Sequence, residues 1–142
     1  MYATAAQLLD RYSATEIAQR ADTAIPPQVD GELLAKAAQG DDLTGHTPAQ
    51  QAAAAVALNR VERALRDADS TIDCYLASRY ATPVTQAAEV LERIACQLAR
   101  YFLYDDGATS QVQSHYSDAV AFLREIAAGS VQLGASTNEG AA

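Results

Sequence analysis

The sequence predicts an all-α fold: an elongated helical bundle with one long central helix, two antiparallel helices after it, short amino-terminal helices and an extended carboxy-terminal arm. Three observations support this prediction. Apolar residues recur at steps of three and four along most of the chain. Thr4, Ser13 and Thr47 are each followed three positions later by Glu or Gln, which is typical of helix starts. Finally, no glycine or proline interrupts residues 49–79.

Two of the helix-start signals lie close to the amino terminus. Thr4 with Gln7, and Ser13 with Glu16, predict short helices near residues 4–11 and 14–22. The stretch "TAIPPQVDG" then forms a connector, because its two prolines cannot continue a helix. A further short helix is expected over residues 31–39, and the glycines and polar residues of "GDDLTGH" end it.

The third signal begins the long central helix, which we expect over residues 48–79. Thr47 is placed to cap it, and Pro48 at the first helical position loses no hydrogen bond. At ~1.5 Å per residue such a helix would be roughly 48 Å long, more than a compact domain of this size needs. Acidic and basic residues four apart should pair on its exposed face. An apolar stripe runs along it: Leu58, Val61, Leu65, Ala68, Ile72 and Tyr75.

Thr82-Pro83 is a joint after the long helix, because the residue before a proline is disfavoured in the α region. Thr85 is expected to cap a helix near residues 86–104, and "DDG" at 105–107 separates it from a last helix near 109–128. Gly129 suits the left-handed residue that ends this helix. We therefore expect a helical domain over residues 1–129 and an extended arm over 130–142, which orders only against a partner.

Composition narrows the class of function. Across 142 residues the net charge is −8, which disfavours nucleic-acid binding but suits a surface that DNA passes without adhering. Leu, Ile, Val and Phe together make up only 28 residues, so we expect a thin core and some burial between subunits. We find no signal peptide and no segment that could span a membrane, so we expect a protein made in a cytoplasm.

No catalytic, cofactor-binding or metal-binding residues are predicted, and we expect a protein that is not an enzyme. Cys74 and Cys96 form no close pair and are interpreted as buried thiols. The aspartates at 67, 69 and 73 are interpreted as a solvated acidic face. His46 and His115 each stand alone, without a second ligand or an orienting group nearby.

Arginine and tyrosine suggest a different role. Six arginines (60, 63, 66, 79, 93 and 100) could grip an anionic substrate, but nearby acids favour surface or interface ion pairs. Arg-Tyr dipeptides occur three times, and both residue types are enriched at interfaces; the alternative is that the rings close the edge of the core. The candidate partner interface comprises Arg79, Tyr80, Tyr101, Val131 and Leu133.

Four segments resemble the Mu-like prophage family typified by gene product thirty-six of phage Mu. They are "MYATAAQLLDRYSATEIAQRAD", "ALRDADSTIDCYLASRYATPV", "LERIACQLARYFLYDD" and "HYSDAVAFLREIAAGSVQLG". The resemblance covers nearly the whole chain. The segment "AAQGDDLTGHTPAQQAAAAVALN" is longer and richer in alanine than the family pattern, which leaves open where the long helix begins and whether the loop at 41–46 is an added contact.

The resemblance implies a head-tail connector of the virion neck. Such a protein forms a ring of about twelve copies between the portal protein and a stopper or tail-completion protein, and DNA passes through the ring without specific binding. Neither cofactor nor membrane is implied. One alternative is an acidic helical module of phage origin that binds a host protein. The other is a small helical enzyme that uses the arginines on an anionic metabolite.

Overall fold

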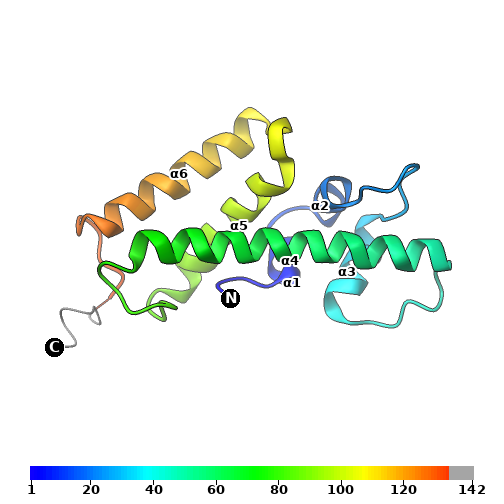
Figure 1. Ribbon diagram of the computed structural model, residues 1–142, viewed down its shortest axis with the longest axis horizontal. Coiled ribbons are helices and arrows are strands. Elements are labelled where there is room, and N and C mark those ends of the chain that lie inside the picture. The colour runs from blue at the N-terminus through cyan, green and yellow to red at the C-terminus, as the bar shows by residue number, and fades with distance from the viewer. Residues whose placement is uncertain (135–142) are drawn as a thin grey trace.

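A computed structural model describes residues 1–134 and confirms the all-α prediction (Figure 1). Within these residues there is no strand. The helices are α1 (Ala5–Arg11), α2 (Ala14–Ala21), α3 (Gly31–Gln39), α4 (Pro48–Leu76), α5 (Ala88–Tyr104) and α6 (Ser110–Ala127), with a short 3₁₀ turn over Asp105–Gly107.

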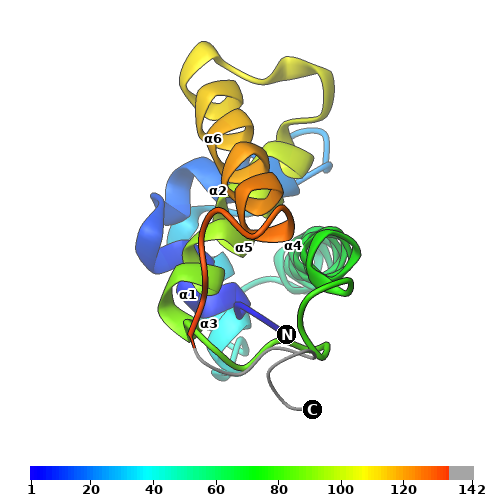
Figure 2. The same cartoon turned by 90° about the vertical axis from the view of Figure 1, so that its left-hand side faces the viewer.

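The 29-residue α4 is the central element along the long axis of the molecule, as predicted (Figure 1). Viewed end-on, it lies at one edge, and the other helices gather on one side of it (Figure 2). In Figure 1, α2 and α3 lie beside its amino-terminal half, whereas its other half packs with α5 and α6. The outer face of α4 is therefore open to solvent along its length.

Local capping signals explain most of the helix starts. Thr4 and Gln7 form a complete capping box at α1, and Thr47 and Gln50 form another at α4. Ser13 caps α2 through the backbone N–H of Glu16, but the side chain of Glu16 does not reach back. The box at α2 is therefore only half formed, and the reason lies in a tertiary contact described below.

Two boundaries differ from the prediction. The long helix ends at Leu76 rather than at residue 79. Beyond Leu76 the chain forms a turn, in which the Arg79 N–H bonds to the Leu76 carbonyl three residues back, and the Tyr80 side chain is buried in the core. The next helix begins at Ala88, and Thr85 does not cap it. Its N-cap is Ala87, in the left-handed region at φ 52°, with no side-chain cap.

One contiguous core joins all the helices. Eleven of the thirty residues in the buried cluster are alanine, so the core is thin in bulky side chains, as the composition predicts. The small residues allow close approach: a Cβ on Gly31 would come within 2.7 Å of the Thr15 backbone nitrogen, so α2 and α3 could not pack as they do with a larger residue there. Bulky residues concentrate where α4, α5 and α6 meet.

Residues 130–134, the start of the predicted arm, pack against the helical body. Gly129 ends α6 with φ 85°, as predicted, and a Cβ there would lie only 2.0 Å from a guanidinium nitrogen of Arg79. Val131 and Leu133 contact the core, and the Leu133 N–H donates to the Tyr80 hydroxyl at 3.0 Å. These residues are thus held by the chain itself. The rest of the predicted arm, residues 135–142, lies outside the described residues.

Candidate interaction surfaces

A half-buried polar cluster ties α2 to α5. Arg100 donates from Nε and Nη2 to the two carboxylate oxygens of Glu16, at 2.7 and 3.0 Å. The Tyr104 hydroxyl donates to the same carboxylate at 2.7 Å, and the Arg100 guanidinium lies 4.2 Å from the centre of the Tyr12 ring. Nη1 of Arg100 is 3.4 Å from Nδ1 of His115. The Glu16 carboxylate therefore binds Arg100 and Tyr104 and does not complete the capping box at α2.

The pKa values in this cluster follow from burial and charge. Burial alone would raise the pKa of Glu16, but hydrogen bonds from Arg100 and Tyr104 outweigh it and hold the pKa below its usual value. Burial and the hydrogen bond to Glu16 raise the pKa of Tyr104. Because the carboxylate is ionised and bidentately paired, the cluster is a structural clamp between helices rather than a source of protons.

The amino terminus is fastened to the end of α4 by a second polar cluster. The Tyr2 backbone N–H donates to Asp69 at 2.9 Å, and its hydroxyl donates to Asp73 at 2.5 Å. The same hydroxyl accepts from the Val84 backbone N–H at 2.8 Å. The two aspartates were predicted to be a solvated acidic face, whereas they bind Tyr2. They also line an open cavity of about 300 Å³.

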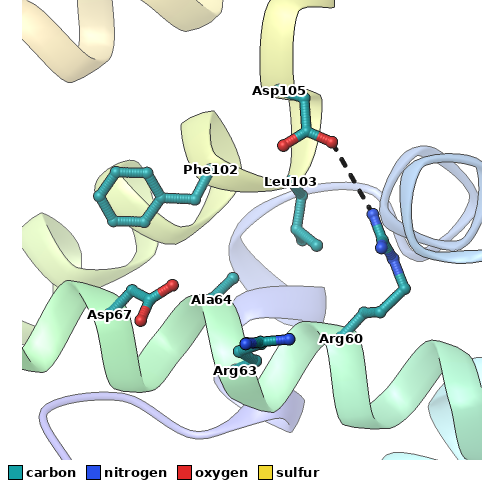
Figure 3. A pocket seen from close by; sticks show the side chains of 7 residues that line it. All are labelled: Arg60, Arg63, Ala64, Asp67, Phe102, Leu103 and Asp105. Atoms are coloured by element: carbon teal, nitrogen blue, oxygen red, sulfur yellow. Dashed lines mark ion pairs between the residues drawn. The ribbon is translucent and has the colours of Figure 1, made fainter.

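The arginines of α4 line a third site, a cavity of about 170 Å³ beside α5. Figure 3 shows Arg60 pointing toward Asp105, at an N–O distance of 3.9 Å, with Phe102 on the opposite side of the cavity. The Nε atom of Arg60 is buried and has no hydrogen-bond partner within residues 1–134. Arg63 and Asp67 complete the charged lining. Two cations and two carboxylates balance each other, so the cavity does not select a free anion.

The structure brings four of the five candidate interface residues together. Arg79, Tyr80, Val131 and Leu133 meet where α4 ends and the chain leaves α6. Tyr80 is fully buried, so its contacts are within the chain. Tyr101 lies elsewhere, stacked on Tyr116 with ring centres 3.9 Å apart.

Tyr101, Phe102 and Tyr116 form a half-buried aromatic cluster between α5 and α6. Phe102 meets Tyr116 edge-on, with ring centres 6.2 Å apart. The sequence left two readings of the tyrosines open, and the described contacts support the reading as core edge. Two arginines lie over tyrosine rings that are distant in the sequence: Arg100 lies over Tyr12, and Arg20 lies over Tyr104.

The two cysteines differ. Cys96 is buried, as predicted, and burial raises the pKa of its thiol to about 12. The prediction is wrong for Cys74, which is exposed because its position falls on the outer face of α4. In the part of the chain that the structure describes, no three His, Cys, Asp or Glu side chains are placed to hold a metal ion.

Most of the ion pairs within residues 1–134 form between elements. Arg11 pairs with Glu92, Arg60 with Asp105 and Arg100 with Glu16. Oppositely charged residues four positions apart were expected to pair on the exposed face of the long helix. Within residues 1–134, Glu62 with Arg66 and Arg63 with Asp67 do not form, nor does Glu89 with Arg93. Glu32 with Lys36 is the pair with this spacing that does form. Which of these ion pairs form could not be predicted from residue spacing, because it depends on how the helices cross.

None of the helices in residues 1–134 combines the length and apolarity that crossing a bilayer requires.

Comparison with known proteins places the chain in a family. Residues 2–142 match the model of the family described as Bacteriophage Mu, Gp36. The chain is 44% identical over 80 residues to the "Mu-like prophage FluMu protein gp36" of Haemophilus influenzae, covering 56% of this chain and 57% of that protein. It is 36% identical over 73 residues to "Gene product J" of Escherichia phage Mu, covering 51% and 52%. The matched regions thus span a little over half of each curated relative. Because the family model covers nearly all of the chain, the protein belongs to the bacteriophage Mu Gp36 family.

Proposed function

We propose that this protein is a structural head-tail connector, an adaptor whose copies form a ring between the portal protein and a stopper or tail-completion protein. Its place would be the neck of the virion, after synthesis in the host cytoplasm. The protein would act by geometry and not as an enzyme, joining its neighbours and leaving a central channel for DNA.

The observation that carries the proposal is the elongated body built on α4. At ~1.5 Å per residue, its 29 residues extend over about 44 Å, so one rigid element can carry contacts at both ends of a subunit. A ring member needs distinct surfaces on opposite sides, because each copy contacts two neighbours. Family membership in a phage Mu lineage supports a role in the particle.

Two further features agree with this role. The net charge of −8 would repel the DNA backbone, which suits a channel that conducts DNA without binding it. The cavities at Arg60 and at Asp69 are open, with volumes of about 170 and 300 Å³, and charged groups lie in each. Small-molecule sites are usually larger, more enclosed and mainly apolar. The described surface therefore favours protein contacts over chemistry on a metabolite.

Mixing the purified protein with the portal protein of its own phage tests the proposal. We expect ring-shaped complexes by electron microscopy and co-sedimentation at micromolar concentration. Mass spectrometry of purified particles should also find the protein in the virion. If the protein does not bind the portal protein and is absent from purified particles, it is not a connector.

An acidic helical module that binds a host protein is the alternative. It would instead give a tight one-to-one complex with a host factor and no complex with the portal.

A further inference from the structure

Residues 130–134, called here the strap, lie against the linker between α4 and α5. The Leu133 N–H donates to the Tyr80 hydroxyl at 3.0 Å, and a Cβ on Gly134 would lie 3.6 Å from the Cβ of Gln86. The surface of the linker at Tyr80 and Gln86 is called here the strap site. Figure 2 shows the strap outside the helices, running from the end of α6 toward the start of α5. The contact joins two segments that are not helical, so it can open without the loss of a helix.

The strap binds through one side only. Val131 and Leu133 are half-buried and pack against the core, whereas the other three strap residues are exposed. Alternate apolar side chains and a backbone hydrogen bond are the means by which an extended peptide binds a protein surface. The strap site is thus a peptide-binding surface that the chain fills with its own residues. The same five residues of another copy can fill it with the same contacts.

The strap can leave its site at a small cost. Leu98 of α5 and Leu123 of α6 are fully buried, whereas the two apolar side chains of the strap are only half-buried. Because the stabilisation from burial scales with the apolar area removed from water, the strap is held more weakly than either helix. Weakly held segments open first in a folded protein.

Glycines on both sides of the strap contact allow the chain to take more than one path. Gly129 has φ 85° and Gly134 has φ 144°, which are values that other residues rarely adopt. With these values the strap lies on the linker of its own chain. Glycine adopts negative φ about as readily, so rotation at Gly129 can direct the strap away from its own body without strain.

Charge makes the strap suited to joining copies. The chain carries a net charge of −8, so copies repel one another at most of their surfaces. The strap has no charged side chain, and the guanidinium of Arg79 lies against Gly129 where the strap begins. A contact made through the strap therefore adds no acidic group to the interface between copies.

The reach of the strap fixes which ends of two copies must meet. Five extended residues span roughly 17 Å. Figure 1 shows the end of α6, the end of α4 and the linker after it at one end of the molecule. A strap can therefore enter the strap site of another copy only where the two copies abut at this end.

We infer that the strap is exchanged between neighbouring copies: residues 130–134 of one copy leave their own strap site and occupy that of the next. Exchange keeps the contacts between strap and site and adds a link between copies, and a ring holds each strap close to the next site. Each copy gives one strap and receives one, so the contact repeats around the ring. This inference rests on the proposed function, in which copies stand side by side, and it identifies what joins them.

Two single-cysteine chains test the exchange. In a Cys74→Ser background, one chain carries Gln86→Cys in the strap site and the other carries Gly134→Cys at the end of the strap; Cys96 is buried and stays. A Cβ separation of 3.6 Å lies within the range of disulfides. Gly134 is exposed, so a cysteine there can relax its φ without moving the buried part of the strap.

The two chains are mixed in equal amounts and mildly oxidised, with the portal protein and also alone at high concentration. We expect a dimer that contains one chain of each kind on a non-reducing gel, because neither chain can form the bond within itself. Each chain oxidised without the other should stay monomeric.

A chain with both engineered cysteines gives the reciprocal test. Oxidised alone at low concentration, it should form the bond within one copy, which locks the strap on its own site. The locked chain should bind the portal protein at least about tenfold more weakly until the bond is reduced. Oxidation after assembly should instead give a ladder of joined copies. Each single-cysteine chain, treated with the same oxidant, should bind the portal protein normally.

The role of the apolar side chains is tested in the chain that carries Gly134→Cys. Leu133→Ser should lower the yield of mixed dimer at least about tenfold, because the apolar burial is lost. Gln132→Ser is the matched control, since it changes an exposed residue of the same strap, and it should leave the yield unchanged. Circular dichroism should show the same helix content in all of these chains.

The outcomes separate this inference from the proposed function. Rings with the portal protein but no mixed dimer, or dimers from each single-cysteine chain by itself, would overturn the exchange and leave the connector role standing. Mixed dimers without portal binding would keep the exchange and remove the connector role. A locked chain that assembles as well as its reduced form, or a Leu133→Ser chain that crosslinks as well as its parent, would also overturn the exchange.

Discussion

Helix α4 is continuous, but its two halves pack against their neighbours in different ways. The first half, residues 48–59, carries no charged side chain, and its fully buried positions are the alanines at 54 and 57. The second half, residues 60–76, buries Val61, Leu65, Ile72 and Leu76 and carries its charged side chains at exposed and half-buried positions. Alanine lets α2 and α3 approach closely but gives little apolar burial, whereas the bulky side chains of the second half bury far more.

This difference implies that the two ends of the molecule are stabilised differently. The half that packs on α5 and α6 depends on apolar burial. The amino-terminal helices bury Leu8, Ile17, Leu33 and Leu34, and α2 is also linked to α5 by the pair between Glu16 and Arg100. Substitutions should reveal how much each of these contributions adds to stability.

The largest effect is expected in the second half. Leu65 is fully buried, so Leu65→Ala should lower the free energy of unfolding by about 2–5 kcal/mol through lost burial and the cavity left behind. Urea denaturation followed by circular dichroism measures it. The exposed neighbour serves as control: Arg66→Ala should change stability by less than about 0.5 kcal/mol. A loss below about 1 kcal/mol at Leu65 would contradict the contrast between the halves.

The next largest effect is expected for the ion pair between Glu16 and Arg100, which links α2 to α5. Glu16→Gln removes the charged partner of Arg100 and should cost about 1.5–3 kcal/mol at neutral pH. Because the folded-state pKa of Glu16 lies below its ordinary value of 4.5, its contribution is present above that pH and is lost as the pH falls through the folded-state pKa.

The difference in unfolding free energy between wild type and Glu16→Gln should therefore shrink on acidification. Urea titrations at a series of pH values measure it. If the difference stays constant down to strongly acidic pH, the Glu16 carboxylate is not the titrating group that stabilises the contact between α2 and α5.

The close approach at the first half of α4 can be tested by overfilling it. Ala57 is fully buried, so Ala57→Leu should destabilise by about 1–3 kcal/mol because the neighbouring helices must move apart. Ala55 is exposed on the same helix, and Ala55→Leu should cost less than about 0.5 kcal/mol. Equal effects of the two substitutions in thermal unfolding would mean that this half is loosely packed.

Local sequence signals predicted the helices well because they depend on neighbours in the chain. The capping pairs at Thr4 and Thr47 form as expected, and Gly129 adopts the left-handed conformation. The box at Ser13 is half formed because Arg100, distant in the sequence, takes the carboxylate of Glu16. A charged tertiary partner outweighs a capping bond to its own helix.

Interactions between helices could not be predicted from residue spacing. The pairing of Tyr2 with Asp69 and Asp73 joins residues about seventy positions apart, and nothing near either partner signals it. The candidate interface around Tyr80 and Leu133 was predicted as a set of contacts for a partner, and the structure places these two against each other. Apolar periodicity identifies a buried face but does not name the element that covers it.

The smallest effect is expected where the amino terminus is fastened to α4. Tyr2→Phe removes the hydroxyl that donates to Asp73 and accepts from the Val84 N–H, and it should cost about 1 kcal/mol. The matched control is Tyr75→Phe, because the Tyr75 hydroxyl makes no hydrogen bond within residues 1–134, and it should cost less than about 0.5 kcal/mol.

Alkaline pH gives this prediction a second readout. Burial and the hydrogen bond to Asp73 raise the pKa of Tyr2 to about 12, so its contribution is fully present below the ordinary value of 10.0 and is lost as the pH rises toward 12. The stability difference between wild type and Tyr2→Phe should shrink over that interval. If it stays level, the Tyr2 hydroxyl does not hold the amino terminus on α4, and the second half of α4 is held by its apolar core alone.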